Sequence, residues 1–155
     1  MSKLAAIRIR GEIGLSGENR YTMSLLKLFN KNYCVVVNNS KNYIGMLTKI
    51  KDYITWGEVN EETISLLIKN RGRLAGNRNI TEEYLKEKNI NLNEFVNDFV
   101  SNKKTFKDIP GLKQFFRLKP PTHGFERGGI KRPFSLGGVL GYRKDKINDL
   151  IKRML

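Results

Sequence analysis

The first 59 residues alternate between strand-like and helix-like apolar patterns, and this alternation restricts the fold more than any other feature of the chain. Residues 3–10, KLAAIRIR, end in alternating isoleucine and arginine, which predicts a strand with one buried face and one basic, outward face. YCVVV at 33–37 predicts a buried strand, and residues 53–56 alternate again as YITW. The chain is therefore predicted to begin strand, helix, strand, helix, strand.

The two helices between these strands are expected to cover one face of the sheet. The apolar positions at helical spacing are Tyr21, Leu25, Leu28 and Phe29 in the first helix and Ile44, Leu47 and Ile50 in the second. Three strands with helices returning over one face form a two-layer α/β sandwich. The opposite face of the sheet must then be covered by a later part of the chain.

Residues 60–102 predict three short helices. Each is expected to begin after a capping residue and to carry acidic side chains in its first turn. The expected caps are Asn60, Thr81 and Asn91, and Glu94 stands three residues after the last of them, as in a capping box. Residues 58–102 carry six basic and eight acidic residues, so this part of the chain is nearly neutral. We interpret it as a structural or protein-contacting part of the chain.

The net charge restricts the possible partners. Twenty-nine Lys and Arg residues against fifteen Asp and Glu residues give a net charge of +14, which favours an anionic partner such as nucleic acid. The charge is concentrated in residues 1–57, with +6, and residues 103–155, with +10. An anionic membrane surface is the weaker alternative, since no apolar run approaches the roughly 18 residues of a spanning helix. The protein is expected to be soluble and cytoplasmic.

The stretch 117–144, RLKPPTHGFERGGIKRPFSLGGVLGYRK, contains three of the four prolines and six of the fourteen glycines, so it predicts a long irregular loop. An amphipathic helix follows, with apolar residues at Ile147, Leu150, Ile151, Met154 and Leu155, and its docking would fix the end of the loop. Basic side chains, glycines and aromatic rings together are typical of a segment that lies against folded RNA. KNRGRLAGNRNIT at 69–81 predicts a second, arginine-rich phosphate-binding loop.

Catalytic and metal-binding patterns are weak. Cys34 is expected to be a buried strand residue, and the single histidine, His123, lies about ninety positions away. GEIGLSG at 11–17 leaves nucleotide binding as an enzyme alternative, although its spacing differs from GxGxxG. We therefore expect no enzyme activity, no cofactor, no metal and no small-molecule substrate, with a free RNA-binding regulator or assembly factor as a further alternative.

Five blocks in order along the chain resemble the archaeal branch of the large-subunit ribosomal protein family called L-thirty in bacteria and L-seven in eukaryotes. The blocks are IRIRGEIG, GMLTKIKDYITWGEV, LLIKNRGRLAGNRNIT, FFRLKPPTHGFERGGIKRPFSLGGVLGYR and KINDLIKRM. The resemblance implies an α+β fold with a ferredoxin-like βαβαβ core over residues 1–59 and a three-stranded antiparallel sheet. Residues 60–155 would add the helical insert, the basic loop and the C-terminal helix, packed on the core as one domain.

The same resemblance implies a structural constituent of the large ribosomal subunit that binds ribosomal RNA near the 5S ribosomal RNA, beside neighbouring ribosomal proteins. The RNA-facing positions that it implies are Arg71, Arg73, Asn77, Arg78, Gly128, Lys131, Arg132, Phe134, Tyr142 and Arg143. The basic patterns of the strand and loop add Arg8, Arg10, Arg117, Lys119 and Arg127.

Overall fold

The strands of the first part of the chain form an antiparallel sheet with β1 in its centre. A computed structural model describes residues 2–155 and places β1 (Lys3–Arg8) between β2 (Tyr33–Asn38) and β3 (Ile54–Val59). This arrangement confirms the predicted α+β, ferredoxin-like fold class.

The sheet has five strands rather than three, because the C-terminal part of the chain adds one short strand at each edge. β4 (Phe116–Arg117) pairs antiparallel with β2, and β5 (Gly141–Tyr142) pairs parallel with β3, giving the order β4-β2-β1-β3-β5. Two residues are too few for a side-chain alternation to be visible in the sequence.

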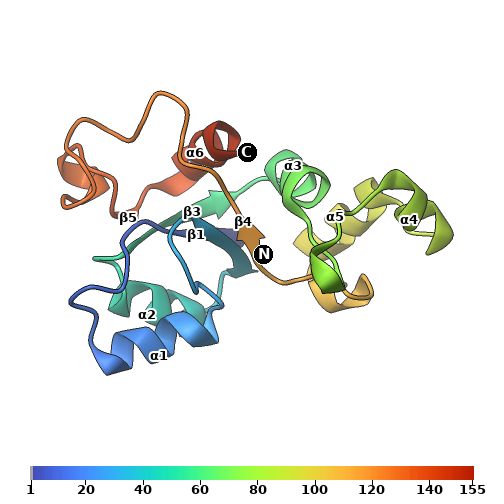
Figure 1. Ribbon diagram of the computed structural model, residues 1–155, viewed down its shortest axis with the longest axis horizontal. Helices are drawn as coiled ribbons and strands as arrows, with labels where there is room; N and C mark the ends of the chain where they lie inside the picture. Colours follow the sequence, from blue (N-terminus) through green and yellow to red (C-terminus); the bar gives the residue numbers. More distant parts are fainter. Residues whose placement is uncertain (1) are drawn as a thin grey trace.

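Two helices, α1 (Gly17–Leu25) and α2 (Lys41–Lys49), cover one face of the sheet (Figure 1). Each begins at a serine, Ser16 or Ser40, whose hydroxyl accepts a hydrogen bond from a backbone N–H of the first turn. The apolar cluster between these helices and the sheet includes Met23, Leu26, Leu28, Leu47, Ile50, Val35 and Trp56.

The apolar face predicted for α1 is wrong. Tyr21 and Leu25 are 66% and 56% exposed, whereas Met23 and Leu26 are buried. The helix ends at Leu25, and Lys27 then adopts a left-handed backbone with φ of 61°, while Leu28 N donates to Met23 O in a Schellman-type turn. The turn ends the helical phase, so the spacing from 21 to 29 does not mark one face.

The other face of the sheet is covered by the later helices, as the two-layer core required. These are α3 (Glu61–Arg71), α5 (Leu92–Val100) and α6 (Ile147–Met154), with α4 (Glu82–Glu87) farther from the sheet (Figure 1). The three predicted caps are confirmed, since Asn60, Thr81 and Asn91 each accept a backbone hydrogen bond through the side chain. The apolar face of α6 is also confirmed, because Ile147, Leu150, Ile151 and Met154 are buried.

Coverage of both faces buries all six residues of β1. Arg8 is only 2% exposed, so the basic, outward face predicted for this strand is wrong at this position. Lys3, at the other end of β1, is buried as well. The alternation of Ile7, Arg8 and Ile9 therefore marks two covered faces rather than one, while Arg10, beyond the strand, is partly exposed.

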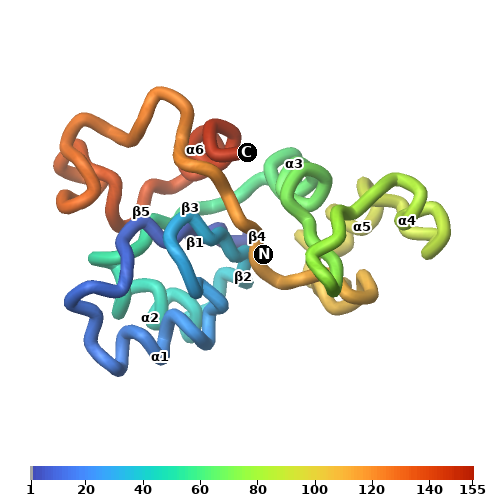
Figure 2. The backbone as a smooth tube through the Cα atoms, viewed as in Figure 1, coloured from blue at the N-terminus to red at the C-terminus, as the bar shows by residue number. Residues whose placement is uncertain are grey.

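The segment from β4 to α6 runs across the molecule rather than away from it. After β4 it passes the end of α6, forms a wide loop, and returns to β3 as β5, as the orange part of Figure 2 shows. We call residues 117–144 the basic loop. Its two ends lie at opposite edges of the sheet, and α6 follows directly after it through a short 3-10 turn, Lys144–Lys146.

Candidate nucleic-acid interface

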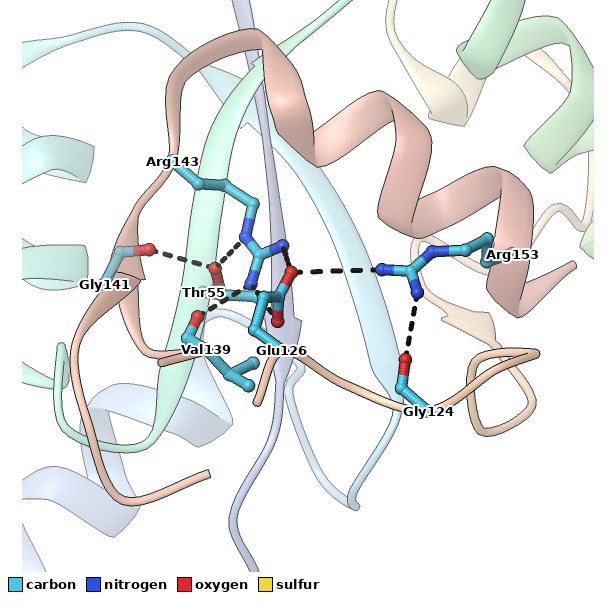
Figure 3. A network of polar contacts seen from close by, with 7 residues as sticks. All are labelled: Thr55, Gly124, Glu126, Val139, Gly141, Arg143 and Arg153. Carbon is cyan, nitrogen blue, oxygen red and sulfur yellow. Dashed lines mark hydrogen bonds and ion pairs between the residues drawn. The ribbon is translucent and has the colours of Figure 1, made fainter. Parts of the chain in front are cut away.

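Arg143 fixes the carboxyl end of the basic loop from inside the protein (Figure 3). Its Nε donates to Thr55 Oγ1 at 2.7 Å, its Nη1 to Glu126 Oε1 at 2.8 Å, and its Nη2 to Val139 O at 2.8 Å. The guanidinium also lies 4.7 Å from the centre of the Phe134 ring. The side chain is 1% exposed, so these contacts replace its hydration. The sheet and three parts of the loop are thereby joined at one residue.

Glu126 is the only acidic residue of the basic loop, and it is neutralised internally. In addition to Arg143, Arg153 of α6 approaches it, with Nη2 at 3.9 Å from Oε1. Arg153 Nη1 also donates to Gly124 O at 2.9 Å (Figure 3). The carboxylate therefore does not oppose the positive charges on the outer side of the loop.

The beginning of the loop is held by the last turn of α6. Lys119 N donates to Met154 O at 2.9 Å, and Thr122 N donates to Arg153 O at 3.0 Å. Arg71, at the end of α3, donates from its guanidinium to Leu155 O. We call the arginine-rich segment at 69–81 the arginine-rich turn. The structure therefore brings the start of the basic loop and the start of the arginine-rich turn to the same end of α6.

The tip of the basic loop is a close backbone turn. Gly128 N donates to Gly137 O at 3.0 Å, and Val139 N and Leu140 N donate to Arg132 O at 3.0 and 3.1 Å. At Gly138, a Cβ atom would lie only 2.1 Å from Arg132 O, so this approach requires glycine. Turning the backbone inward in this way directs polar main-chain groups to one another and leaves the long side chains outside.

Among the fifteen predicted site residues, the structure distinguishes three groups. The exposed ones are Asn77, Arg78, Arg117, Lys119, Arg127, Lys131, Arg132 and Tyr142. The partly exposed ones are Arg10, Arg71, Arg73, Gly128 and Phe134, and the buried ones are Arg8 and Arg143. Of the exposed arginines and lysines in the first group, none forms an ion pair within residues 2–155. These side chains form the free positive surface.

Arg8 and Arg143 have structural roles, so neither is retained in the candidate interface. The Arg8 Nη1 donates to Leu28 O and Phe29 O at 2.8 and 2.7 Å, and its Nε donates to Arg10 O at 2.9 Å. Burial lowers the pKa of Arg8, while Glu12 opposes this effect. An arginine that ends a covered strand looks in sequence like an outward basic residue, because both fit an alternating pattern.

The arginine-rich turn is short and closed. Leu74 N donates to Arg78 O at 2.8 Å and Asn77 N donates to Leu74 O at 3.0 Å, with Gly76 at φ 74° and Asn77 at φ 61°. Glycine and asparagine tolerate this left-handed backbone best. The turn presents the side chains of Asn77 and Arg78 to solvent.

Tyr142 is exposed but already has a partner. Its hydroxyl donates to the Glu58 carboxylate, and its ring lies 6.2 Å from that of Trp56. The hydrogen bond to Glu58 raises the pKa of Tyr142 to about 12, with a smaller effect of burial. Tyr142 nevertheless remains 45% exposed.

Two exposed lysines beside this surface, Lys144 and Lys146, were not among the predicted site residues. Both lie in the turn between β5 and α6 and form no ion pair within the described residues. The only sequence signal for them was the high positive charge of residues 103–155, which does not identify single side chains.

Other kinds of site find little support. Across residues 2–155, no group of three or more His, Cys, Asp and Glu side chains could hold a metal ion. In the same range, no helix combines the length and the apolar character needed to cross a bilayer. Cys34 is fully buried, as predicted, and burial raises the pKa of its thiol, which keeps it protonated and unreactive.

Residues 4–54 match the family model described as "Ribosomal protein L30p/L7e". Several curated archaeal proteins named "Large ribosomal subunit protein uL30" are similar over nearly their whole length. The protein of Methanopyrus kandleri is 48% identical over 149 residues, which cover 95% of this chain and 100% of the relative. That of Methanococcus vannielii is 45% identical over 97% of this chain and 98% of its own. That of Nanoarchaeum equitans is 42% identical over the full length of both. The similarity therefore includes the basic loop and α6.

Proposed function

Because the chain belongs to the ribosomal protein L30p/L7e family, we propose that its free positive surface binds ribosomal RNA and stabilises the folded RNA of the large subunit. The protein is a structural constituent of the large ribosomal subunit.

The exposed basic residues of the basic loop are the main support for this RNA-binding surface. Five basic residues of the basic loop are exposed and form no ion pair within residues 2–155: Arg117, Lys119, Arg127, Lys131 and Arg132. The one carboxylate of the same loop, Glu126, is instead paired with Arg143 and Arg153. Cations placed in this way can neutralise phosphates and release condensed counterions. Their loop is attached at both ends, so binding does not have to order a free tail.

The arginine-rich turn extends the proposed surface. Arg71 and Lys119 both lie near the last turn of α6, through their contacts with Leu155 and Met154. Guanidinium groups at Arg71, Arg73 and Arg78 offer forked donors that suit phosphate oxygens. Asn77 and Tyr142 would add an amide donor and a stacking ring.

We further propose that this surface lies near the 5S ribosomal RNA. Its support is the family resemblance of the five sequence blocks, and the geometry of the loop is compatible with any converging RNA helices. Photo-crosslinking from a benzoylphenylalanine at position 131 in assembled subunits, followed by mapping of the RNA adducts, tests it. Adducts confined to RNA segments far from the 5S molecule would exclude this placement.

The RNA-binding surface is tested with purified protein and a transcript of the large-subunit ribosomal RNA, by measuring affinity over a range of salt concentrations. The triple variant Arg127→Ala, Lys131→Ala, Arg132→Ala should reduce the slope of log K against log salt by about 3, because about three phosphate contacts are lost. A matched triple variant, Lys51→Ala, Lys86→Ala, Lys88→Ala, removes the same charge from exposed lysines outside the surface.

The comparison of the two triple variants decides the outcome. A large loss of affinity in the loop variant, with little change in the matched variant, supports a localised interface. Equal losses in both would mean that the protein binds RNA through its overall charge alone, and the proposed surface would be rejected.

A further inference from the structure

One edge of β2 is open over most of its length. In β2, only Tyr33 and Cys34 pair with β4. The chain just before β4 lies away from the sheet, since Lys113 N donates a hydrogen bond to Arg73 O. Within residues 2–155, no strand lies beside Val35–Asn38 on this side. These four residues offer an edge about 13 Å long, at about 3.3 Å for each residue of a strand.

The backbone of Val36 faces this open edge. Leu118 N donates to Asn32 O on the β4 side of β2, and Cys34 lies opposite Phe116 on the same side. In an antiparallel sheet, every second residue of a strand directs its N–H and C=O groups to the same neighbouring strand. The N–H and C=O groups of Val36 therefore point to the same side of β2 as those of Cys34. The edge therefore presents one donor and one acceptor at the position where a further strand would pair.

A groove of about 350 Å³ follows this edge. One wall comes from the α1 and α2 layer and includes Leu25 and Tyr43, and the other comes from α5 and the turn after it and includes Phe99 and Phe106. Figure 2 shows β2 between these two parts of the chain. At the β4 end, Lys27 donates a hydrogen bond to Gln114 across the groove.

The charges around the groove all have one sign. Its charged lining residues are Lys3, Lys27, Lys104 and Lys107, and no Asp or Glu is among the lining residues. Lys104 is paired with Asp98 at 2.8 Å, whereas Lys107 is exposed and forms no ion pair among residues 2–155. An anionic occupant is favoured over a neutral or cationic one.

Lys3 gives the groove a buried and uncompensated positive charge. The residue is 3% exposed, and its Nζ donates to Asn38 Oδ1 at 2.5 Å and to Asn102 Oδ1 at 2.6 Å, 4.2 Å from the centre of the Phe99 ring. Two neutral amides occupy two of the three ammonium donors, and the third forms no hydrogen bond to residues 2–155. Burial lowers the pKa of Lys3, as expected for a cation without a carboxylate beside it.

We propose that this groove binds an extended acidic peptide segment of a neighbouring protein, which pairs with β2 beside Val36 and places a carboxylate at Lys3. An edge that offers both N–H and C=O is complementary to a peptide backbone, and the alternate side chains of an added strand would reach the two apolar walls. A phosphate backbone supplies acceptors but no matching row of donors. This interface is separate from the RNA-binding surface and does not depend on it.

The test uses the full chain, labelled with ¹⁵N and titrated with a blocked hexapeptide of alternating glutamate and valine. We expect saturable amide shifts centred on Val35, Val36 and Val37, and no saturable shift with the corresponding lysine and valine peptide. Lys107→Glu should raise the Kd about fivefold through charge reversal at the rim. Lys3→Met should raise it about tenfold, because a charge-assisted hydrogen bond is lost.

Lys51→Glu is the matched control, since it makes the same charge change at an exposed lysine that does not line the groove. It should leave the Kd nearly unchanged. Absence of a saturable shift at β2, equal binding of the lysine peptide, or an equal effect of Lys51→Glu and Lys107→Glu would overturn the proposal. If heptauridylate shifts the same amides and displaces the glutamate peptide, the occupant is RNA and the peptide proposal fails.

Discussion

Three basic side chains, Lys3, Arg8 and Arg143, are buried, and each has a different set of partners. Arg143 faces a carboxylate, Arg8 faces backbone carbonyl oxygens, and Lys3 faces two amide oxygens. The cost of removing a charge from water is offset best by an opposite charge and least by neutral dipoles. The net charge of +14 therefore includes positive groups that hold the fold together as well as those that attract RNA.

Replacement of Arg143 by methionine should lower the free energy of unfolding by about 3–5 kcal/mol, because it leaves the Glu126 carboxylate without its close partner in a partly buried site. Urea denaturation measures this change. The double variant Arg143→Met, Glu126→Gln should recover part of the loss. Arg132→Met on the exposed tip is the comparison and should change stability by no more than about 0.5 kcal/mol.

The ionisation of Tyr142 should depend on Glu58. Its folded pKa of about 12 lies above the ordinary tyrosine value of 10.0, so the hydrogen bond to Glu58 stabilises the folded state fully below about pH 10. This contribution is lost as the pH rises from 10 toward 12. Ultraviolet titration of the folded protein, compared with Tyr142→Phe, identifies this tyrosine, and Glu58→Gln should bring its pKa back toward 10. A Tyr142 that titrates normally in the parent protein would contradict the hydrogen bond.

Elements that depend on local signals were predictable from the sequence, and those that depend on distant contacts were not. The caps at Asn60, Thr81 and Asn91 are bonds between near neighbours, so residue type and spacing predicted them. The buried face of α1 depended on where the helix stopped, and the roles of Arg8 and Arg143 depended on segments that lie far away in the chain. β4 and β5 are strands only because β2 and β3 are beside them.

Two glycines should respond in opposite ways to the same substitution. Gly138→Ala would place a Cβ 2.1 Å from Arg132 O, so it should open the tip of the basic loop and destabilise it. Gly45 lies inside α2 with nothing within 4 Å of the added Cβ, so Gly45→Ala should stabilise the protein by about 0.5–1 kcal/mol.

Thermal unfolding and hydrogen exchange of the two alanine variants separate these effects. Faster exchange in Gly138→Ala should be confined to the amides of residues 127–141. Unchanged exchange there would mean that the backbone approach between Arg132 and Gly138 is not required for the loop.

On the scale of the whole molecule, the protein combines a sheet covered on both faces with a positive loop fastened to α6. Quantitative mass spectrometry of salt-washed large subunits should find about one copy of this chain for each particle, beside accepted subunit proteins. A far smaller amount, with most of the chain in free fractions, would favour a free RNA-binding regulator or assembly factor instead.

Rising salt should also release the isolated protein from RNA, because counterions compete for the phosphates.

The position of α6 determines when the protein can fold during its own synthesis. This helix packs on β3 and α3, yet it is made about ninety residues after β3. At roughly 5–20 residues per second, translation needs about 4–18 s to cover that distance. During this time the sheet face that contains Ala5, Ile7 and Val59 lacks the part of its cover that α6 supplies. A nascent chain that stops before residue 147 therefore leaves apolar core residues of this face in contact with water, and the native fold is completed only once translation has passed α6.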